Sequence, residues 1–209
     1  MAASNAKSVS LLAVLLLGSL ASLSARAARV AKPRTEPIVL DAQSADADLA
    51  NNNVVFRKVK ITQGSMAISA DQGQGTQQKT RLDFENSLWV FRGNVRISMD
   101  EGLLTSDDAE ISFVGQELSK AVANGKPAEF QQRVAKTGKL AQGHADIINY
   151  DAAKGVVVLS KSAWLTDGQY EIHGESLKYN MVAQSIVADA VDQGSQRVHI
   201  VIPPPPPKP

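Results

Sequence analysis

A hairpin-like pattern that returns at a nearly constant spacing restricts the fold of this chain more than any other feature. Residues 87–107 show it most clearly, because apolar side chains alternate there with polar ones. The apolar positions are Trp89, Phe91, Val95, Ile97 and Met99. Such alternation is typical of a β-strand with one buried face. The polar turn formers at 100–102 then reverse the chain, so the stretch predicts a bent hairpin.

The same pattern recurs along the chain at intervals of roughly 31 to 36 residues, which lies in the range of stacked structural repeats. One offset superimposes residues 59–61 on 95–97 and residues 68–71 on 104–107. Each unit carries an apolar stripe that it cannot bury alone, whereas stacked neighbours would bury their stripes in one core. The fold class that we predict is all-β: an elongated, open β-jellyroll of about 14–16 antiparallel strands built from stacked hairpin repeats.

The first 27 residues have the pattern of an export signal. Lys7 precedes an apolar segment that is shorter than the about 20 residues needed to span a membrane, and residues 25–27 form an A-x-A-like cleavage site. We expect residues 1–27 to be a cleaved signal peptide and residues 28–37 a flexible lead-in. The jellyroll domain is expected at 38–202, followed by a disordered proline-rich tail at 203–209.

Composition excludes several classes of function. A chain cleaved after residue 27 retains 182 residues, enough for one domain with a sizeable core. It has 20 basic and 21 acidic residues, which gives no basis for attraction to nucleic acid or anionic membranes. The chain has no cysteine, so disulfides and thiol chemistry are excluded.

Side chains that could carry catalysis are scattered rather than clustered. The three histidines lie in different repeat units without metal-binding spacing: His144, His173 and His199. Four polar residues fall at equivalent repeat positions and are interpreted as turn and strand-end groups: Asp71, Asp107, His144 and Glu175. We therefore expect no enzymatic activity, no cofactor and no metal site.

The apolar stripe has two interpretations, a filled sheet core or an interior that leaves a slot for a lipid. The chain has only five Phe, three Tyr and two Trp, so aliphatic side chains dominate the interior and could leave a groove that alkyl chains complete. The predicted groove residues are Val59, Ile61, Ile68, Phe91, Val95, Ile97, Leu104, Phe130, Leu140, Leu165 and Ile172.

Three sequence features together resemble the LptA/OstA family of periplasmic lipopolysaccharide-transport bridge proteins. They are the repeat centre FRGNVRI at 91–97, the stretch GKPAEFQQ at 125–132 and the Tyr-Asp turn at 150–151. The resemblance covers roughly residues 38–202. The sequence departs from the pattern at 57–58 and 161–162, where other residues replace the Gly-Asn pair.

The resemblance implies a periplasmic carrier that binds the acyl chains of lipopolysaccharide in its groove. Such a carrier bridges the jellyroll domains of inner- and outer-membrane transport components for outer-membrane assembly. Copies would join head to tail by pairing their free sheet edges. The predicted edge residues are Ile38 and Leu40 at one end and Val198, Ile200 and Ile202 at the other.

Two alternatives remain open from the sequence. A β-solenoid that binds or cleaves polysaccharide would need exposed aromatic platforms or a carboxylate pair, and only Trp164 stands out on the polar face. The jellyroll domain of a neighbouring transport component is the other alternative. It would be accompanied by a retained N-terminal anchor or a long C-terminal barrel.

Overall fold

The computed structural model describes residues 36–48, 50–78, 81–133, 138–168, 170–189 and 198–202. These ranges all belong to one compact unit, Pro33–Pro209. The predicted signal peptide, most of the lead-in and the proline-rich tail lie outside the described residues. No helix within the described ranges is long and apolar enough to cross a membrane.

The described secondary structure is one antiparallel sheet of 13 strands, which confirms the predicted all-β class. The strands are β1 (Val39–Asp41), β2 (Ser44–Asp48), β3 (Asn53–Gln63), β4 (Met66–Gln78), β5 (Arg81–Leu82), β6 (Asn86–Met99), β7 (Gly102–Val114), β8 (Glu117–Arg133), β9 (Leu140–Asp151), β10 (Val156–Thr166), β11 (Glu171–Asn180), β12 (Ser185–Asp189) and β13 (His199–Val201). Their number in these ranges is slightly below the expected one, because long strands such as β8, with 17 residues, continue through a bend.

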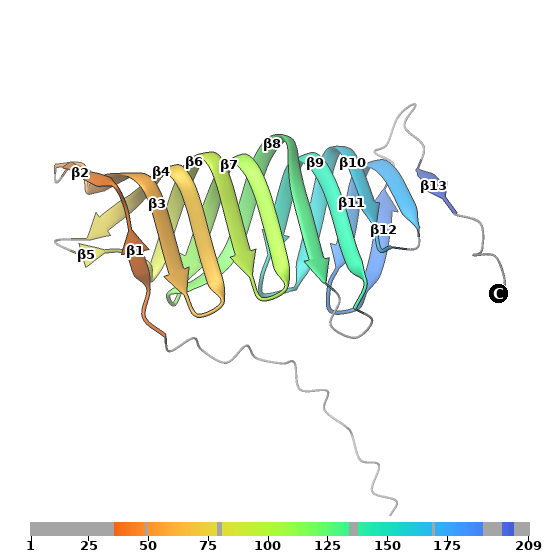
Figure 1. The fold of residues 1–209 in the computed structure, drawn as a ribbon, viewed down its shortest axis with the longest axis horizontal. Helices are drawn as coiled ribbons and strands as arrows, with labels where there is room; N and C mark the ends of the chain where they lie inside the picture. Colours follow the sequence, from red (N-terminus) through yellow and green to blue (C-terminus); the bar gives the residue numbers. More distant parts are fainter. Residues whose placement is uncertain are drawn as a thin grey trace, which may run out of the picture. The chain divides into compact units, whose positions relative to one another are not determined.

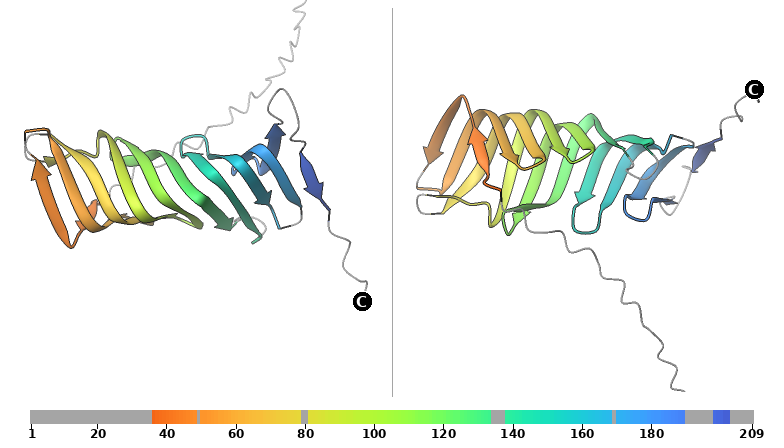
Figure 2. Two further views of the ribbon diagram at one scale, coloured as in Figure 1. Left: turned by 90° about the horizontal axis from the view of Figure 1, so that it is seen from above. Right: turned by 60° about the horizontal axis from the view of Figure 1, so that its bottom comes forward.

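The strands follow one another along the sheet almost in sequence order, as expected for stacked hairpins (Figure 1). Each edge of the sheet is a strand split in two. β1 and β2 pair with the two halves of β3, and β13 and β12 pair with the two halves of β11. The sheet thus has ten strand positions across its width, with the N-terminal strands at one end and the C-terminal strands at the other (Figure 2).

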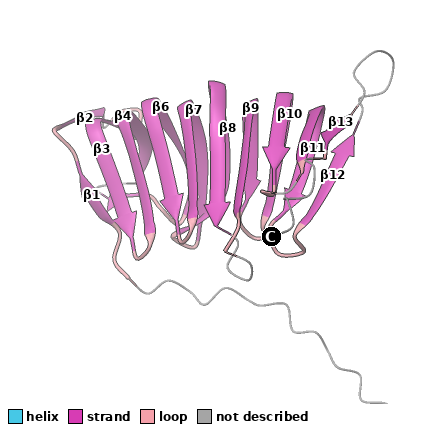
Figure 3. Cartoon of the chain, turned by 45° about the vertical axis from the view of Figure 1, so that its right-hand side comes forward, coloured by secondary structure: helices cyan, strands magenta, loops and turns pink. Residues whose placement is uncertain are grey.

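A line of backbone irregularities folds the sheet lengthwise into two facing limbs (Figure 3). The pairing register shifts near the middle of β6, β8 and β10. Left-handed φ angles occur there at Lys58 (49°), Gly93 (74°), Asn94 (52°), Lys161 (65°) and Ser162 (52°). The residues at 58 and 161–162, which depart from the Gly-Asn pattern, therefore adopt the same backbone conformation as that pair. We call the two halves the β1 limb and the β2 limb, after the edge strand that each contains.

Charged side chains of opposite sign alternate along this bend. Strands β3, β8 and β10 place Lys58, Lys126 and Lys161 there, and the returning strands place acidic residues opposite them. The acidic residues are Asp71, Asp107, Asp146 and Glu175. The sequence analysis placed Asp71, Asp107, His144 and Glu175 at equivalent repeat positions. The structure agrees except on β9, where Asp146 and not His144 holds that position. The two residues lie on the same face of the strand, so the alternation alone did not distinguish them.

Inward-facing positions form two rows that cross the whole sheet. The row on the β1 limb is Leu40, Ile61, Ile68, Ile97, Leu104, Phe130, Gly143, Leu165, Ile172 and Ile200. The row on the β2 limb is Ala45, Phe56, Gly73, Phe91, Ala109, Ala123, Ile148, Leu159, Leu177 and Ala188. Buried members of both rows belong to one core cluster, so the two limbs pack against each other.

Candidate functional site

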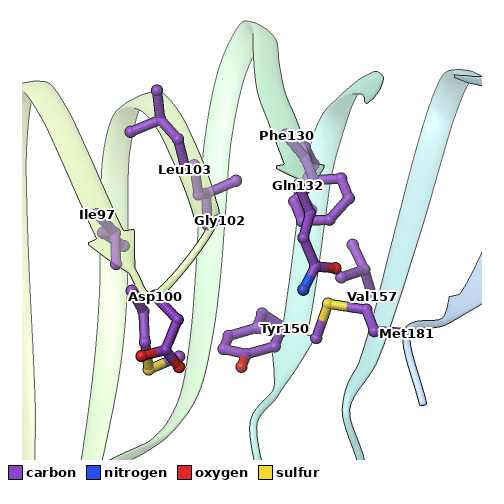
Figure 4. A pocket seen from close by; sticks show the side chains of 12 residues that line it. Ile97, Asp100, Gly102, Leu103, Phe130, Gln132, Tyr150, Val157 and Met181 are labelled. Carbon is purple, nitrogen blue, oxygen red and sulfur yellow. The ribbon is translucent and has the colours of Figure 1, made fainter. Parts of the chain in front are cut away.

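An apolar pocket with a cavity volume of about 90 Å³ lies between the limbs at their open side, where the hairpin turns face each other (Figure 4). We call this open side the mouth. The pocket is lined by Ile97, Met99, Asp100, Gly102, Leu103, Leu104, Phe130, Gln132, Ile148, Tyr150, Val157 and Met181. Residues 97–104 belong to the β1 limb, whereas Ile148, Tyr150 and Val157 belong to the β2 limb. The pocket therefore draws its walls from both halves of the sheet.

Buried side chains differ in size along the sheet. Near the N-terminal edge, Trp89 is fully buried and stacks on Phe84 with ring centroids 4.5 Å apart, with Phe56 and Phe91 at 6.1 Å. These rings fill the space between the limbs. On β7 to β10 seven of the 17 buried apolar positions are alanines, namely Ala109, Ala121, Ala123, Ala128, Ala141, Ala145 and Ala163. None of these alanines lines the pocket, but their small side chains fill less of the interior than the aromatic rings do.

Polar groups of the pocket are confined to a few positions. Asp100 lies in the turn between β6 and β7, and its Oδ1 accepts a hydrogen bond at 2.6 Å from Ser65 Oγ of the preceding hairpin turn. Gln132 and Tyr150 contribute an amide and a phenol to an otherwise aliphatic and aromatic wall. This arrangement suits a molecule with an apolar part inside and a polar part at the mouth.

The structure brings most of the predicted groove residues into one row. Seven of them, Ile61, Ile68, Ile97, Leu104, Phe130, Leu165 and Ile172, lie on the β1-limb row. Phe91 is on the β2-limb row, Val59 and Val95 are buried beside the bend, and Leu140 is half-buried at the start of β9. Only Ile97, Leu104 and Phe130 line the pocket. The others, apart from half-buried Leu140 and Ile172, are packed in the core.

Sequence reasoning missed the side of the pocket that the β2 limb supplies. Ile148, Tyr150 and Val157 alternate along β9 and β10 with the same period of two, so the signal was present. The Tyr-Asp turn at 150–151 was used as a feature of the family resemblance and not as part of the groove. Met99 was predicted as an apolar strand position but not as a groove residue. Gly102 and Met181 were missed because they flank turns, where the alternation stops.

The outer face of the β1 limb carries a polar row that parallels the apolar one. Its members are Asp41, Lys60, Ser69, Arg96, Thr105, Glu129, His144, Trp164, His173 and His199. All three histidines of the chain are thus neighbours of Trp164 or of each other. The His144 and Trp164 rings stack at 5.1 Å, and the His173 and His199 rings lie 5.9 Å apart. In the described part of the chain, no group of three or more His, Cys, Asp or Glu residues could hold a metal ion.

The predicted edge residues lie at the two edges of the sheet that the described residues form. Ile38 and Leu40 are half-buried and pack against the core next to β3. At the opposite edge Val198 is half-buried, whereas Ile200 and Ile202 are 52% and 72% exposed. Exposed apolar side chains on an unpaired edge are a surface that natural proteins either protect or use for pairing.

These features define a class of protein: an open β-jellyroll with an apolar interior, a mouth between two limbs and a free strand at each end. Residues 40–185 match the model of the family described as "LptA/(LptD N-terminal domain) LPS transport protein". The match covers more than half of the sequence. The chain belongs to this family.

Individual relatives are similar over most of the chain. The lipopolysaccharide export system protein LptA of Escherichia coli strain K12 is 28% identical over 174 residues, which cover 82% of this chain and 89% of the relative. The LptA of Shigella flexneri matches with the same values. Among solved structures, LptH is described as the LptA-homologous periplasmic component of the lipopolysaccharide transport device from Pseudomonas aeruginosa. It has 21% identity and a TM-score of 0.44, over 82% of this chain and 98% of LptH.

Proposed function

We propose that this protein is a periplasmic carrier that holds acyl chains of lipopolysaccharide in its interior and bridges the inner- and outer-membrane transport components. The observation that carries the proposal is the apolar pocket at the mouth of the fold. The family to which the chain belongs is described as lipopolysaccharide transport proteins. The match to 89% of the length of E. coli LptA favours the bridge over a jellyroll domain of a neighbouring component.

The size of the pocket fits a carrier that must release its load. Burying an acyl chain of about ten CH₂ groups, at about 0.8 kcal/mol each, would give on the order of 8 kcal/mol. Several fully enclosed chains would bind almost irreversibly. A pocket of about 90 Å³ accommodates only part of one chain. We infer that further acyl chains enter by separating the limbs at the mouth, which leaves the saccharide in water.

The free edges supply the bridge. A strand of a neighbouring jellyroll can add to an unpaired edge through backbone hydrogen bonds, so that the interiors of two molecules become continuous. We propose edge pairing through Ile38 and Leu40 at one end and through Val198, Ile200 and Ile202 at the other. The partners are further copies of this chain and the jellyroll domains of the membrane-bound components.

We infer no enzymatic role, because the family description and the relatives' names concern transport and export. The polysaccharide-binding alternative depends on Trp164 as a sugar platform. His144 already stacks on that indole at 5.1 Å, which leaves less of the ring for a sugar. The geometry therefore favours the lipid carrier.

Charged substitutions at the mouth test the lipid site. Met99→Glu and Met181→Glu place a carboxylate in the pocket wall at half-buried positions, where the sheet can tolerate it. Each should weaken binding of purified lipopolysaccharide about tenfold or more, since an apolar side chain of this size contributes about 1.5–3 kcal/mol when buried. A fluorescent lipid A displacement assay measures the change. Ile97 and Phe130 are less suitable, because they are 5% and 8% exposed and a charge there would disrupt the core.

Arg96→Ala is the matched control. Arg96 is exposed on the outer face of the strand that also carries Ile97 and Met99. Its loss should leave lipopolysaccharide binding unchanged. Normal binding by both glutamate variants, with circular dichroism spectra like that of the wild type, would exclude the pocket as the lipid site.

A further inference from the structure

A short segment between β5 and β6 lies over the interior at the mouth. It comprises Asp83, Phe84 and Glu85, which belong to no strand, and we call it the strap. We propose, building on the carrier role proposed above, that the strap is a gate. The Phe84 ring occupies a slot in the interior, and an acyl chain of the lipid enters this slot when the strap lifts.

The slot is formed by aromatic side chains of the β2 limb. The Phe84 ring stacks on Trp89 with ring centroids 4.5 Å apart and meets Phe113 edge-on at 5.2 Å. Trp89 and Phe113 are fully buried, and Phe84 is only 9% exposed. Trp89 and Phe113 belong to paired strands, whereas Phe84 reaches the slot from outside the strands. Its ring can therefore leave the slot without breaking any strand pairing.

Hydrogen bonds at exposed positions hold the strap against the turn between β7 and β8. The backbone N–H of Gly115 donates to the backbone oxygen of Glu85 at 2.6 Å, and that of Gln116 donates to the backbone oxygen of Phe84 at 3.0 Å. Gln116 Nε2 also donates to Glu85 Oε1 at 2.9 Å. Glu85, Gly115 and Gln116 are exposed, so water can replace these hydrogen bonds when the strap lifts.

The strap is only loosely attached to the sheet at its N-terminal end. The strand before it, β5, is two residues long and pairs with β4 through Gln77 and Gln78 alone (Figure 1). Segments with so few backbone pairs open locally at a low cost in free energy. The strap can therefore move while β6, which follows it, stays paired along its length.

The closed strap leaves one buried polar group unsatisfied. Ser87 lies just after the strap on the inward face of β6, opposite Phe113. It is 9% exposed, and its Oγ has no hydrogen-bond partner among the described residues. A buried hydroxyl without a partner is unfavourable, whereas water satisfies it when it is exposed. Opening the mouth at this point would supply that water, so Ser87 reduces the advantage of the closed form.

The slot is the neighbour of the lipid pocket toward the N-terminal edge. On the β2 limb the pocket is walled by β9 and β10, whereas the strap is fastened at the turn between β7 and β8. An acyl chain that extends from the pocket toward the N-terminal edge therefore meets the Phe84 ring. A phenyl ring and a few CH₂ groups bury comparable apolar areas, so exchanging one for the other changes the free energy little.

Tryptophan fluorescence can report whether an acyl chain enters the slot. The chain has two tryptophans, so Trp164→Phe leaves Trp89 as the single emitter. The probe is lipid A with bromine atoms on its acyl chains, because bromine quenches an indole only at close contact. Binding of this lipid to the full chain should quench Trp89. The same lipid without bromine is the control and should leave the emission unquenched.

A reversible cross-link tests whether the strap must lift. Glu85→Cys and Gln116→Cys are added to the Trp164→Phe protein, which has no native cysteine, at two positions whose side chains already meet. Loss of free thiols confirms the disulfide. The oxidised protein should still bind lipid A at the mouth in the displacement assay but lose the quenching of Trp89, and reduction should restore it.

Removing the ring separates a gate from a purely structural clamp. Phe84→Ala in the oxidised protein should restore quenching, because the ring and not the cross-link blocks the slot. Phe84→Ala without the cysteines should be quenched at a lower lipid concentration than its parent, a measurement that needs no disulfide. Circular dichroism checks that the sheet remains folded in each variant.

The outcomes distinguish the gate from the carrier role. Lipid binding without quenching in the reduced protein would overturn the gate and leave the pocket as the lipid site. Equal quenching in the oxidised and reduced forms would do the same, as would a Phe84→Ala protein that needs as much lipid as its parent. If neither form binds lipid A at all, the carrier role fails and the gate fails with it.

Discussion

Asn94 Nδ2 donates a hydrogen bond of 2.6 Å to Asp71 Oδ2 across the bend of the sheet. The other carboxylate oxygen of Asp71 accepts from Lys58 Nζ, also at 2.6 Å. A single carboxylate on β4 therefore ties β3 and β6 together where both strands have left-handed backbone angles. These angles are unfavourable for residues other than glycine, so side-chain contacts that stabilise them matter.

We predict that Asp71→Asn lowers the free energy of unfolding near neutral pH but not in strong acid. The hydrogen bond from Lys58, followed by that from Asn94, lowers the pKa of Asp71 below the ordinary value of 3.8. A lowered pKa stabilises the fold above the ordinary value, and this stabilisation is lost as the pH falls through the lowered one. Urea unfolding of both proteins near neutral pH and below pH 3.8 measures the difference. If Asp71→Asn lowered the free energy of unfolding equally at both pH values, the charge of Asp71 would not be the cause of its effect.

Gly143→Ala is expected to destabilise the protein by about 1–3 kcal/mol, the usual cost of overfilling a packed interior. Gly143 is the one gap in the apolar row of the β1 limb. A Cβ there would lie 2.7 Å from Leu159 Cδ2 and 2.9 Å from the backbone oxygen of Trp164. Urea unfolding gives the change. In the control Gly174→Ala, the atom nearest to the Cβ would be the flexible end of Leu177 at 3.2 Å, so its effect should be smaller. Equal effects would show that the gap is not tightly packed.

The alternation of apolar residues predicted the fold and most of one row, because strand periodicity depends only on which face is buried. It could not predict where the interior is hollow. Ile61 and Ile97 occupy equivalent positions of their repeats, yet only Ile97 lines the pocket. The difference comes from what the opposite limb supplies: large rings such as Trp89 on the N-terminal strands, and the pocket-lining side chains of Ile148, Tyr150 and Val157 further along.

Features of the bend were also only partly predictable. The Gly-Asn pair at 93–94 signalled left-handed angles, because these residues adopt them readily. Lys58 and Lys161 adopt the same angles against their own preference. Neighbouring strands continue the bend, so the backbone at these two lysines has to follow it. This constraint acts between repeats, whereas a residue's own backbone preference acts within one repeat.

Tyr179→Phe should make the protein more resistant to alkali. Tyr179 is 3% exposed, and burial, followed by the charge of Asp167, raises the pKa of its phenol above the ordinary 10.0. A raised pKa stabilises the fold below the ordinary value, and this stabilisation is lost as the pH rises through the raised one. Urea unfolding at about pH 8 and about pH 11 should show a loss for the wild type that is smaller in the variant. An identical loss in both proteins would mean that another group governs the alkaline behaviour.

Deleting residues 198–209 should abolish self-association while the remaining sheet stays folded. β13 pairs with β11 through three residues only, Glu171 to His173, and its own side chains are exposed, so few buried contacts are lost. The deletion nevertheless removes Ile200 and Val201, which form the apolar edge proposed to meet the next copy. Sedimentation across a range of concentrations measures association, and circular dichroism checks the fold. A shorter deletion of residues 203–209 is the control and should associate like the full chain. If the protein lacking 198–209 still forms the same oligomers, the contact between copies lies elsewhere.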